Sequence, residues 1–213
     1  MNFKFLYLFL YIVLLFTPIG NFWQALSFSM EINNEMIPLL NYLLLGLLGL
    51  LVFRREYRES LKKSIRKPGR FGIRLIGVYV GTLVLGGILV TLFQVQSAQN
   101  QDLVVSVFKN VPLPLSLIGL GIGGPITEEC IYRELLIGKA GKKFNRVFLS
   151  MISILLFSWV HVMFSSLREI VVYIPMAIGF VYLYTKEEGG LFSSTMGHIM
   201  RNTLSALLMI YII

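Results

Sequence analysis

Long apolar runs constrain this chain more than any other feature. A helix that crosses the ~30 Å hydrocarbon core of a bilayer needs about 20 residues, and seven runs reach or approach that length. They lie at residues 5–23, 36–53, 73–95, 113–137, 147–165, 170–185 and 191–213. Hydrophobic residues make up 56% of the 213 residues and charged residues only 14%, so the interior is too small to hide the apolar surface from water. The sequence therefore predicts an all-α, polytopic transmembrane helix bundle of about seven spans.

Basic residues are unevenly distributed between the runs, and this distribution sets the orientation. Most of them lie after the second run or after the fourth: Arg54, Arg55, Arg58, Lys62, Lys63, Arg66, Lys67, Arg70, Arg74, Lys139, Lys142, Lys143 and Arg146. Only Lys109 and Arg168 fall on the opposite side. The N-terminus is therefore predicted to be cytoplasmic in a multi-pass protein of the cell membrane. The basic loop at 54–74 is also compatible with nucleic-acid or specific lipid binding, but an orientation signal beside anionic headgroups is favoured and no nucleic-acid partner is predicted.

Ionisable and amide side chains interrupt three of the apolar runs. The fourth run carries Glu128, Glu129 and Arg133, the fifth carries His161, and the seventh carries His198, Arg201 and Asn202. Such side chains are costly inside a membrane and usually serve function. Glu129 and Arg133 are four residues apart, so we expect them to pair on one helix face. Arg201 is expected to pair with an acidic side chain.

The depths of these side chains are compatible with one shared site. At ~1.5 Å of rise per residue, Glu128, His161, His198 and Asn202 fall roughly 12–22 Å from the cytoplasmic helix ends, around the middle of a bilayer. A buried glutamate beside a histidine can hold a water molecule and remove its proton. Histidine and asparagine N–H groups can stabilise the oxyanion of a tetrahedral intermediate. These groups together suit peptide-bond hydrolysis.

Three short motifs resemble those of the CPBP family, the CAAX proteases and bacteriocin-processing enzymes, also called the ABI family. Glu128, Glu129 and Arg133 match its E-E-x-x-x-R motif, Phe157 and His161 its F-x-x-x-H motif, and the pair His198 and Asn202 its H-x-x-x-N motif. The resemblance covers about residues 113–205. It implies N-terminal transmembrane helices and a basic cytoplasmic loop in 1–100, followed by a catalytic transmembrane core in 101–213. Members of the family often have eight helices, whereas seven are counted in this sequence.

The resemblance also implies residue roles. Glu128 would activate the water and His161 would help to hold it, while His198 and Asn202 would bind the oxyanion. Glu129, Arg133 and Phe157 would support these groups.

Members of this family are often labelled metalloproteases, so the resemblance leaves metal use open. Zinc normally takes three protein ligands and a water, and Glu128, His161 and His198 could supply three. The sequence contains no H-E-x-x-H motif, and Asn202 suits hydrogen bonding to an oxyanion better than metal ligation. A metal-free site is favoured, with zinc as the alternative cofactor.

The predicted function is that of an intramembrane endopeptidase acting on a peptide or membrane-protein substrate. Its role would be bacteriocin self-immunity, peptide maturation or CAAX-type prenyl-protein processing, and the oligomeric state is not specified. The main alternative is a non-catalytic immunity or scaffold protein that binds a toxin or partner. A transporter is disfavoured because we find no internal repeat. A cysteine–histidine mechanism through Cys130 is disfavoured because a lone cysteine in an apolar helix usually acts as a small hydrophobic residue.

Overall fold

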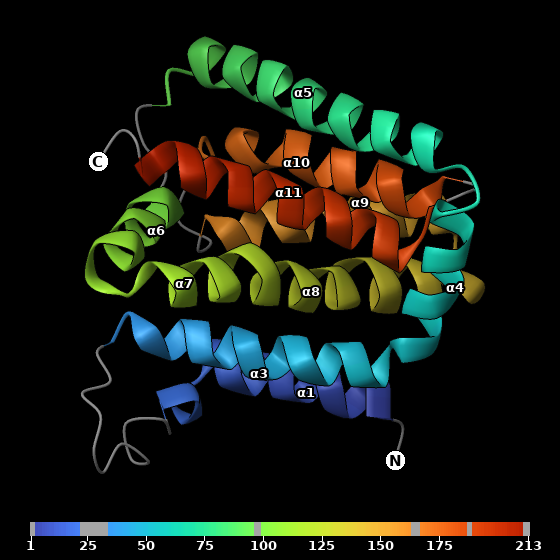
Figure 1. The fold of residues 1–213 in the computed structure, drawn as a ribbon, viewed down its shortest axis with the longest axis horizontal. Coiled ribbons are helices and arrows are strands. Elements are labelled where there is room, and N and C mark those ends of the chain that lie inside the picture. Colours follow the sequence, from blue (N-terminus) through green and yellow to red (C-terminus); the bar gives the residue numbers. More distant parts are fainter. Residues whose placement is uncertain (1–2, 22–33, 96–98, 163–166, 187–188, 211–213) are drawn as a thin grey trace.

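A computed structural model of the chain describes residues 3–21, 34–95, 99–162, 167–186 and 189–210. Every regular element in these ranges is a helix, so the predicted all-α class is confirmed (Figure 1). The elements are α1 (Phe3–Phe16), η1 (Pro18–Asn21), α3 (Met36–Val52), α4 (Arg54–Ser64), α5 (Pro68–Leu92), α6 (Gln99–Asn110), α7 (Leu113–Ser116), η2 (Leu117–Gly123), α8 (Gly124–Glu129), η3 (Cys130–Lys139), η4 (Ala140–Lys142), α9 (Arg146–His161), α10 (Ile170–Thr185) and α11 (Leu191–Ile210).

The helices stack in layers around one helical rod. Elements α7, η2, α8 and η3 follow one another without a break over residues 113–139, and we call them the central rod. Helix α3 packs on one side of the rod with α1 behind it, whereas α9 and α11 pack on the other side. Helix α10 packs against α9 and α11, and α5 covers α10 from outside (Figure 1).

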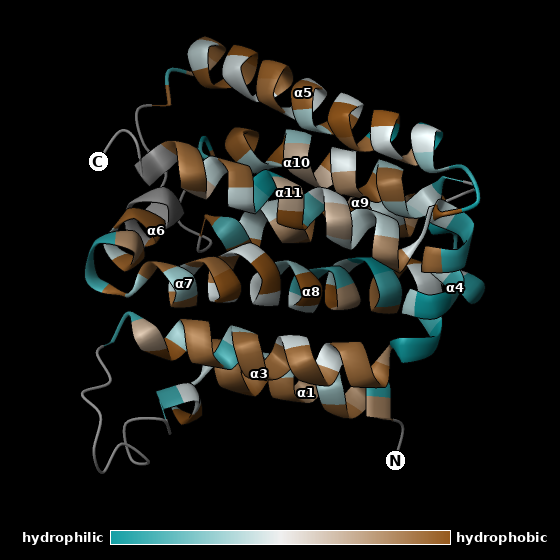
Figure 2. Cartoon of the chain, in the orientation of Figure 1, coloured by the Kyte–Doolittle hydropathy of each residue, from teal (hydrophilic) through white to brown (hydrophobic). Residues whose placement is uncertain are grey.

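The outer surface is suited to lipid contact. Among the described residues, α5 is long and apolar enough to cross a membrane by itself, with a mean hydropathy of 2.2 and only 6% of its most apolar window buried. A second candidate is α3 together with α4, although these two are bent by 77°. Helices α1, α9 and α10 are apolar but shorter. Seven spans therefore remain a prediction. Apolar residues predominate along most helices in Figure 2, whereas α4 is largely hydrophilic.

The basic segment that the sequence suggested was a loop is mostly helical. Arg54–Ser64 form α4, in which Arg55 Nε lies 2.8 Å from Glu59 Oε1 one turn later, an arrangement that supports a solvent-exposed helix. The chain then turns, and Pro68 begins α5, where its fixed φ suits a first helical turn. The segment is helical where a loop was expected, because charge pairing at four-residue spacing and a proline in the first turn both favour helices.

Two glycines allow α3 to approach the central rod closely. A Cβ atom added to Gly46 would lie 3.1 Å from the Cα atom of Gly123, and one added to Gly123 would lie 2.9 Å from the carbonyl oxygen of Tyr42. Small residues permit such backbone contact between membrane helices. This crossing brings the Tyr42 side chain to the part of the rod that carries Glu128.

Candidate active site

The two glutamates lie on α8, between the two π-helical segments of the central rod. Glu128 is 7% exposed, and Glu129 and Arg133 are fully buried. Single π turns inside α-helices occur often at functional sites because they change the directions of neighbouring side chains. Arg133 Nε lies 3.4 Å from Glu129 Oε2, so the expected pair is present.

His161 faces Glu128 from the end of α9. Its Nδ1 lies 2.7 Å from the carbonyl oxygen of Phe157, and since a carbonyl can only accept, Nδ1 carries a hydrogen and donates. In the neutral ring, Nε2 then presents a lone pair. This Nε2 lies 3.6 Å from Glu128 Oε2, a separation longer than a direct hydrogen bond. The two atoms are suited to share one water molecule.

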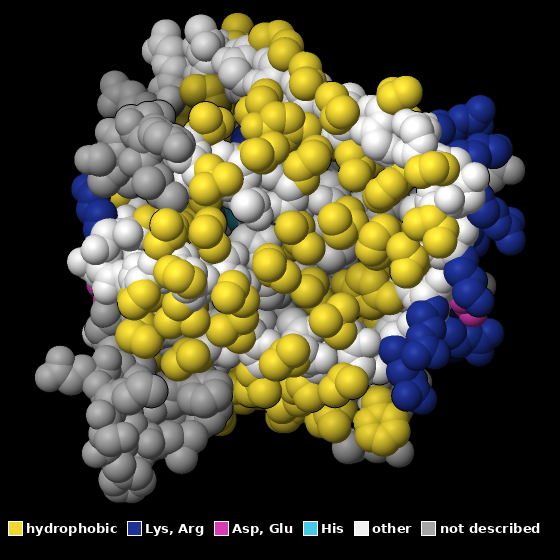
Figure 3. All heavy atoms as spheres, in the orientation of Figure 1, with side chains coloured by type: hydrophobic (Ala, Val, Ile, Leu, Met, Phe, Trp, Pro, Cys, Tyr) yellow, Lys and Arg dark blue, Asp and Glu magenta, His cyan; other side chains and the backbone are white. Residues whose placement is uncertain are grey.

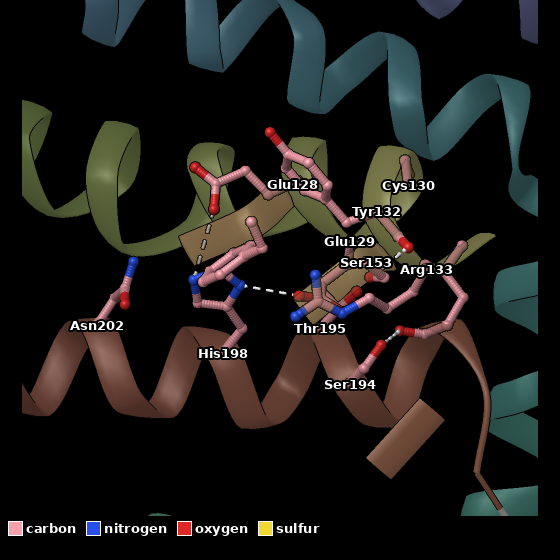
Figure 4. A network of polar contacts seen from close by, with 12 residues as sticks. Glu128, Glu129, Cys130, Tyr132, Arg133, Ser153, Ser194, Thr195, His198 and Asn202 are labelled. Atoms are coloured by element: carbon pink, nitrogen blue, oxygen red, sulfur yellow. Dashed lines mark hydrogen bonds and ion pairs between the residues drawn. The ribbon is translucent and has the colours of Figure 1, made fainter. Parts of the chain in front are cut away.

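His198 approaches Glu128 from α11, and its ring is held in place by Glu129. Its Nδ1 donates to Glu129 Oε1 at 3.1 Å, and its Nε2 lies 3.8 Å from Glu128 Oε2 (Figure 4). A buried carboxylate on Nδ1 fixes the orientation of an imidazole ring, as in other hydrolytic sites. Both histidines therefore present Nε2 to one oxygen of Glu128.

Aromatic rings enclose the polar cluster. The Phe157 ring lies 4.2 Å from that of His161, and the Phe180 ring stacks on His198 at the same centroid separation. The Arg133 guanidinium lies over Phe157 at 4.7 Å. Phe157 was expected to support the site. Phe180 was not predicted, because an aromatic residue in an apolar helix is common and has no spacing relation to the motifs.

Asn202 lies one turn beyond His198 on α11, on the side of the helix that faces the central rod (Figure 4). Its Nδ2 donates to the carbonyl oxygen of Leu120 in η2 at 3.2 Å. The amide is thus held against the rod beside the cluster. The amide forms no hydrogen bond with Glu128, His161 or His198.

Tyr42 is a site residue that the sequence analysis missed. Its hydroxyl donates to Glu128 Oε1 at 3.2 Å, from α3 in the N-terminal part of the chain. The other carboxylate oxygen, Oε2, is buried without a hydrogen-bond partner. Tyr42 therefore occupies one oxygen of Glu128 and leaves the other directed at the histidines. A tyrosine in an apolar run has no spacing relation to the motifs, so sequence alone could not identify it.

Cys130 lies apart from the histidines. It is fully buried, and its Sγ lies 3.8 Å from the Tyr57 hydroxyl. Figure 4 shows its side chain on the far side of the rod from His198. This position suits a packing role for Cys130.

The described side chains show no metal-binding group, and the prediction of a metal-free site stays a prediction. A search of these residues finds no group of three or more His, Cys, Asp or Glu side chains arranged to hold one. The contacts at His198 Nδ1, at His161 Nδ1 and at Glu128 Oε1 hold these groups in place but do not bear on an ion, because metal-ligating histidines commonly donate their second ring N–H in the same way. We therefore derive no step through a metal.

Comparisons with known proteins agree with the motifs. Residues 110–204 match the family model described as type II CAAX prenyl endopeptidase Rce1-like. The chain is also similar to a Bacillus subtilis (strain 168) protein named "Putative membrane peptidase YdiL", with 26% identity over 162 residues. This alignment covers 72% of the present chain and 63% of the relative, so the chain spans less than two thirds of that protein. No solved structure matches. The matched region contains every motif residue, and the comparisons place residues 110–204 of this membrane protein in the Rce1-like CPBP/CAAX protease family.

Proposed function

We propose that this chain is an intramembrane endopeptidase in which Glu128 activates water to hydrolyse a peptide bond. The observation that carries the proposal is the convergence of two imidazole Nε2 atoms, at 3.6 and 3.8 Å, on one buried carboxylate oxygen that has no hydrogen-bond partner. The three groups come from three helices, and the aromatic rings around them limit access of bulk water. Such a pre-arranged polar group in an apolar enclosure is typical of hydrolytic sites.

The first step would be attack of water on the scissile carbonyl. A water between Glu128 Oε2 and His161 Nε2 donates one hydrogen bond to each. Glu128 takes a proton as the water oxygen bonds to the carbonyl carbon, and the carbonyl becomes a tetrahedral oxyanion. General-base assistance of this kind contributes typically about 10²–10⁴-fold in rate.

The oxyanion would be stabilised from α11. His198 would donate through an Nε2–H, with its ring held by Glu129 at Nδ1, and the second Nδ2–H of Asn202 would supply another donor. The intermediate then collapses as Glu128 returns its proton to the leaving amide nitrogen. The C–N bond breaks, and the products are a carboxylic acid, which keeps the second hydrogen of the water, and an amine.

We further propose a multi-pass arrangement in the bacterial cytoplasmic membrane, with about seven spans and a cytoplasmic N-terminus. Figure 3 supports this arrangement, because hydrophobic side chains cover most of the face shown and most Lys and Arg gather at one end. The substrates would be peptides or membrane-associated proteins, and the role would be bacteriocin self-immunity, peptide maturation or prenyl-protein processing.

Reconstitution tests the proposal. The full chain in proteoliposomes, incubated with a pool of membrane-associated peptides, is expected to generate new peptide termini that mass spectrometry detects. Since the proposed mechanism uses no metal, the cleavage rate after chelator treatment is expected to stay within about twofold of the untreated rate. A complete loss with recovery on adding zinc would contradict the metal-free mechanism. Toxin protection without any cleavage would favour the non-catalytic alternative.

Tyr42→Phe tests how Glu128 is positioned. The change removes the hydroxyl that donates to Glu128 Oε1 and leaves the ring in place. Hydrogen bonds to charged groups contribute about 1.5–3 kcal/mol, so we expect kcat to fall by about tenfold or more while KM is unchanged. Tyr11→Phe is the matched control because it removes a buried hydroxyl that contacts Tyr132 at 2.8 Å. Equal kinetic effects of the two changes would show that Tyr42 has only a packing role.

A further inference from the structure

Helix α4 presents cations and apolar side chains together on one exposed side. At 100° per residue, five exposed side chains of α4 and the residue after it project within about 100° of one another around the helix axis. We call them the α4 outer face: Arg54, Arg58, Leu61, Lys62 and Ile65. A helix that combines Lys and Arg with exposed apolar residues in this way is typical of helices that lie in the headgroup region of a membrane.

The direction of α4 also suits a membrane surface. Helix α4 is bent by 77° from α3, so it runs nearly at right angles to that apolar helix. It follows the end of α3 at Val52 and precedes the start of α5 at Pro68. With α3 and α5 crossing the bilayer, α4 lies along the surface where both helices leave the hydrocarbon. The colours of Figure 2 show the same contrast, because α4 is largely hydrophilic between two apolar helices.

The inner side of α4 is fixed to the start of α11. Ser60 Oγ accepts from the backbone N–H of Phe192 at 3.0 Å and donates to the carbonyl oxygen of Gly189 at 3.3 Å. The Tyr57 hydroxyl lies 3.1 Å from Thr195 Oγ1. These contacts set the rotation of α4 about its own axis. The α4 outer face is therefore held in one direction, away from the bundle.

This end of the bundle has a large excess of positive charge. Residues 54–70 contain eight Lys or Arg and only two Glu. Both glutamates already have basic partners, since Glu56 pairs with Lys4 and Glu59 with Arg55. The excess charge of the segment is therefore not neutralised by its own acidic residues.

A second basic segment, far from α4 in the sequence, joins the same surface. The pKa of the Glu59 carboxyl is lowered mainly by the hydrogen bond from Arg55 and further by the nearby Lys63 of α4 and Lys142 of η4. Lys and Arg side chains gather at this end of the molecule (Figure 3). An orientation signal depends only on where cations lie in the sequence. Their convergence from two segments in the folded chain indicates in addition a binding surface.

We propose that the α4 outer face, together with Lys142, binds the headgroups of anionic phospholipids in the surrounding bilayer. The cations match the charge of the lipid phosphates, and each Lys or Arg near an anionic surface contributes about fivefold to binding. Leu61 and Ile65 favour a lipid over a soluble anion, because a lipid carries acyl chains next to its phosphate. The inference concerns lipid binding and does not depend on the proposed hydrolysis.

Lipid titration of the full chain tests this surface. The protein in neutral detergent is titrated with fluorescent phosphatidylglycerol and, separately, with fluorescent phosphatidylcholine, and fluorescence anisotropy gives the two dissociation constants. At low salt we expect phosphatidylglycerol to bind at least about tenfold more tightly, since several cations contribute. The difference should shrink as salt is added, because salt screens exposed charges. Equal binding of the two lipids at low salt would overturn the inference.

A double variant locates the site. Arg58→Gln with Lys62→Gln removes two cations of the α4 outer face, so binding of phosphatidylglycerol should weaken by about tenfold to thirtyfold. The matched control is Lys109→Gln with Arg168→Gln, which removes two exposed cations elsewhere and should change binding by less than about twofold. Thermal unfolding checks that both variants fold. If the α4 variant does not fold, the preference of the unchanged chain for phosphatidylglycerol decides the question.

Three further results would overturn the inference. The first is a preference for phosphatidylglycerol that persists in the folded α4 variant, and the second is an equal loss of binding in the control. The third is displacement of the lipid by a single-stranded oligonucleotide at equal concentration, which would assign the surface to a nucleic acid. Loss of lipid binding in the α4 variant with unchanged peptide cleavage would support the lipid site and leave the proposed hydrolysis intact.

Discussion

Glu128→Gln is expected to abolish peptide hydrolysis while the bundle stays folded. The amide keeps the shape of the side chain and can still accept from Tyr42, but it cannot take a proton from water. Loss of a general base lowers rates by about 10²–10⁴-fold, and the same group must later protonate the leaving amine, so kcat/KM should fall by at least about 10³-fold. Cleavage in proteoliposomes measures the fall, and thermal unfolding in detergent checks the fold.

Glu134→Gln is the matched control for this change. Glu134 is carried by the same central rod, but its carboxylate accepts a hydrogen bond from Tyr184 at 2.8 Å. The control should keep cleavage near the wild-type rate. If Glu128→Gln retained activity comparable to this control, Glu128 would not be the base and the proposed mechanism would fail.

Arg133→Met is expected to be the most destabilising single change near the site. It removes the cation beside Glu129 and leaves that carboxylate fully buried beside His198. Breaking a buried ion pair from one side costs about 3–5 kcal/mol. The free energy of unfolding, measured by denaturant titration in detergent, should fall by an amount in this range.

The double variant Glu129→Gln with Arg133→Met separates charge from packing. Removing both charges eliminates the unpaired carboxylate, so much of the lost stability should return. Activity should stay low because His198 Nδ1 then lacks its anionic acceptor. A double variant as unstable as Arg133→Met alone would show that Arg133 matters mainly through its contact with Phe157.

The Glu129–His198 contact contributes both to the stability of the bundle and to the proposed hydrolysis. The same carboxylate pairs with Arg133 on its own helix and orients His198 on α11, so it joins the rod to the last helix of the bundle. The stacked ring of Phe180 fixes the other face of the imidazole. Substitutions in this group will therefore change stability and rate together, whereas Tyr42→Phe should change mainly the rate.

The sequence by itself determined the helical class, the membrane character and the residues of the three motifs. These follow from local quantities: the length of apolar runs, the cost of a charge among them, and the four-residue spacing that pairs Glu129 with Arg133. A helix at 54–64 was not predicted, although Arg55 and Glu59 have the four-residue spacing at which opposite charges stabilise a helix.

Only the tertiary structure decided which partners those residues meet. The contact of Tyr42 with Glu128 depends on two glycines, Gly46 and Gly123, meeting at a crossing of helices far apart in the sequence. In the described part of the chain, the side-chain partner of Arg201 is the Ser205 hydroxyl and not the acid that the sequence suggested, and this too became visible only when the neighbours of α11 were in place. The spacing of residues along one helix predicts which of its side chains share a face. Which residues of other helices that face contacts depends on how the helices pack, and the packing depends on the shapes of side chains throughout the bundle.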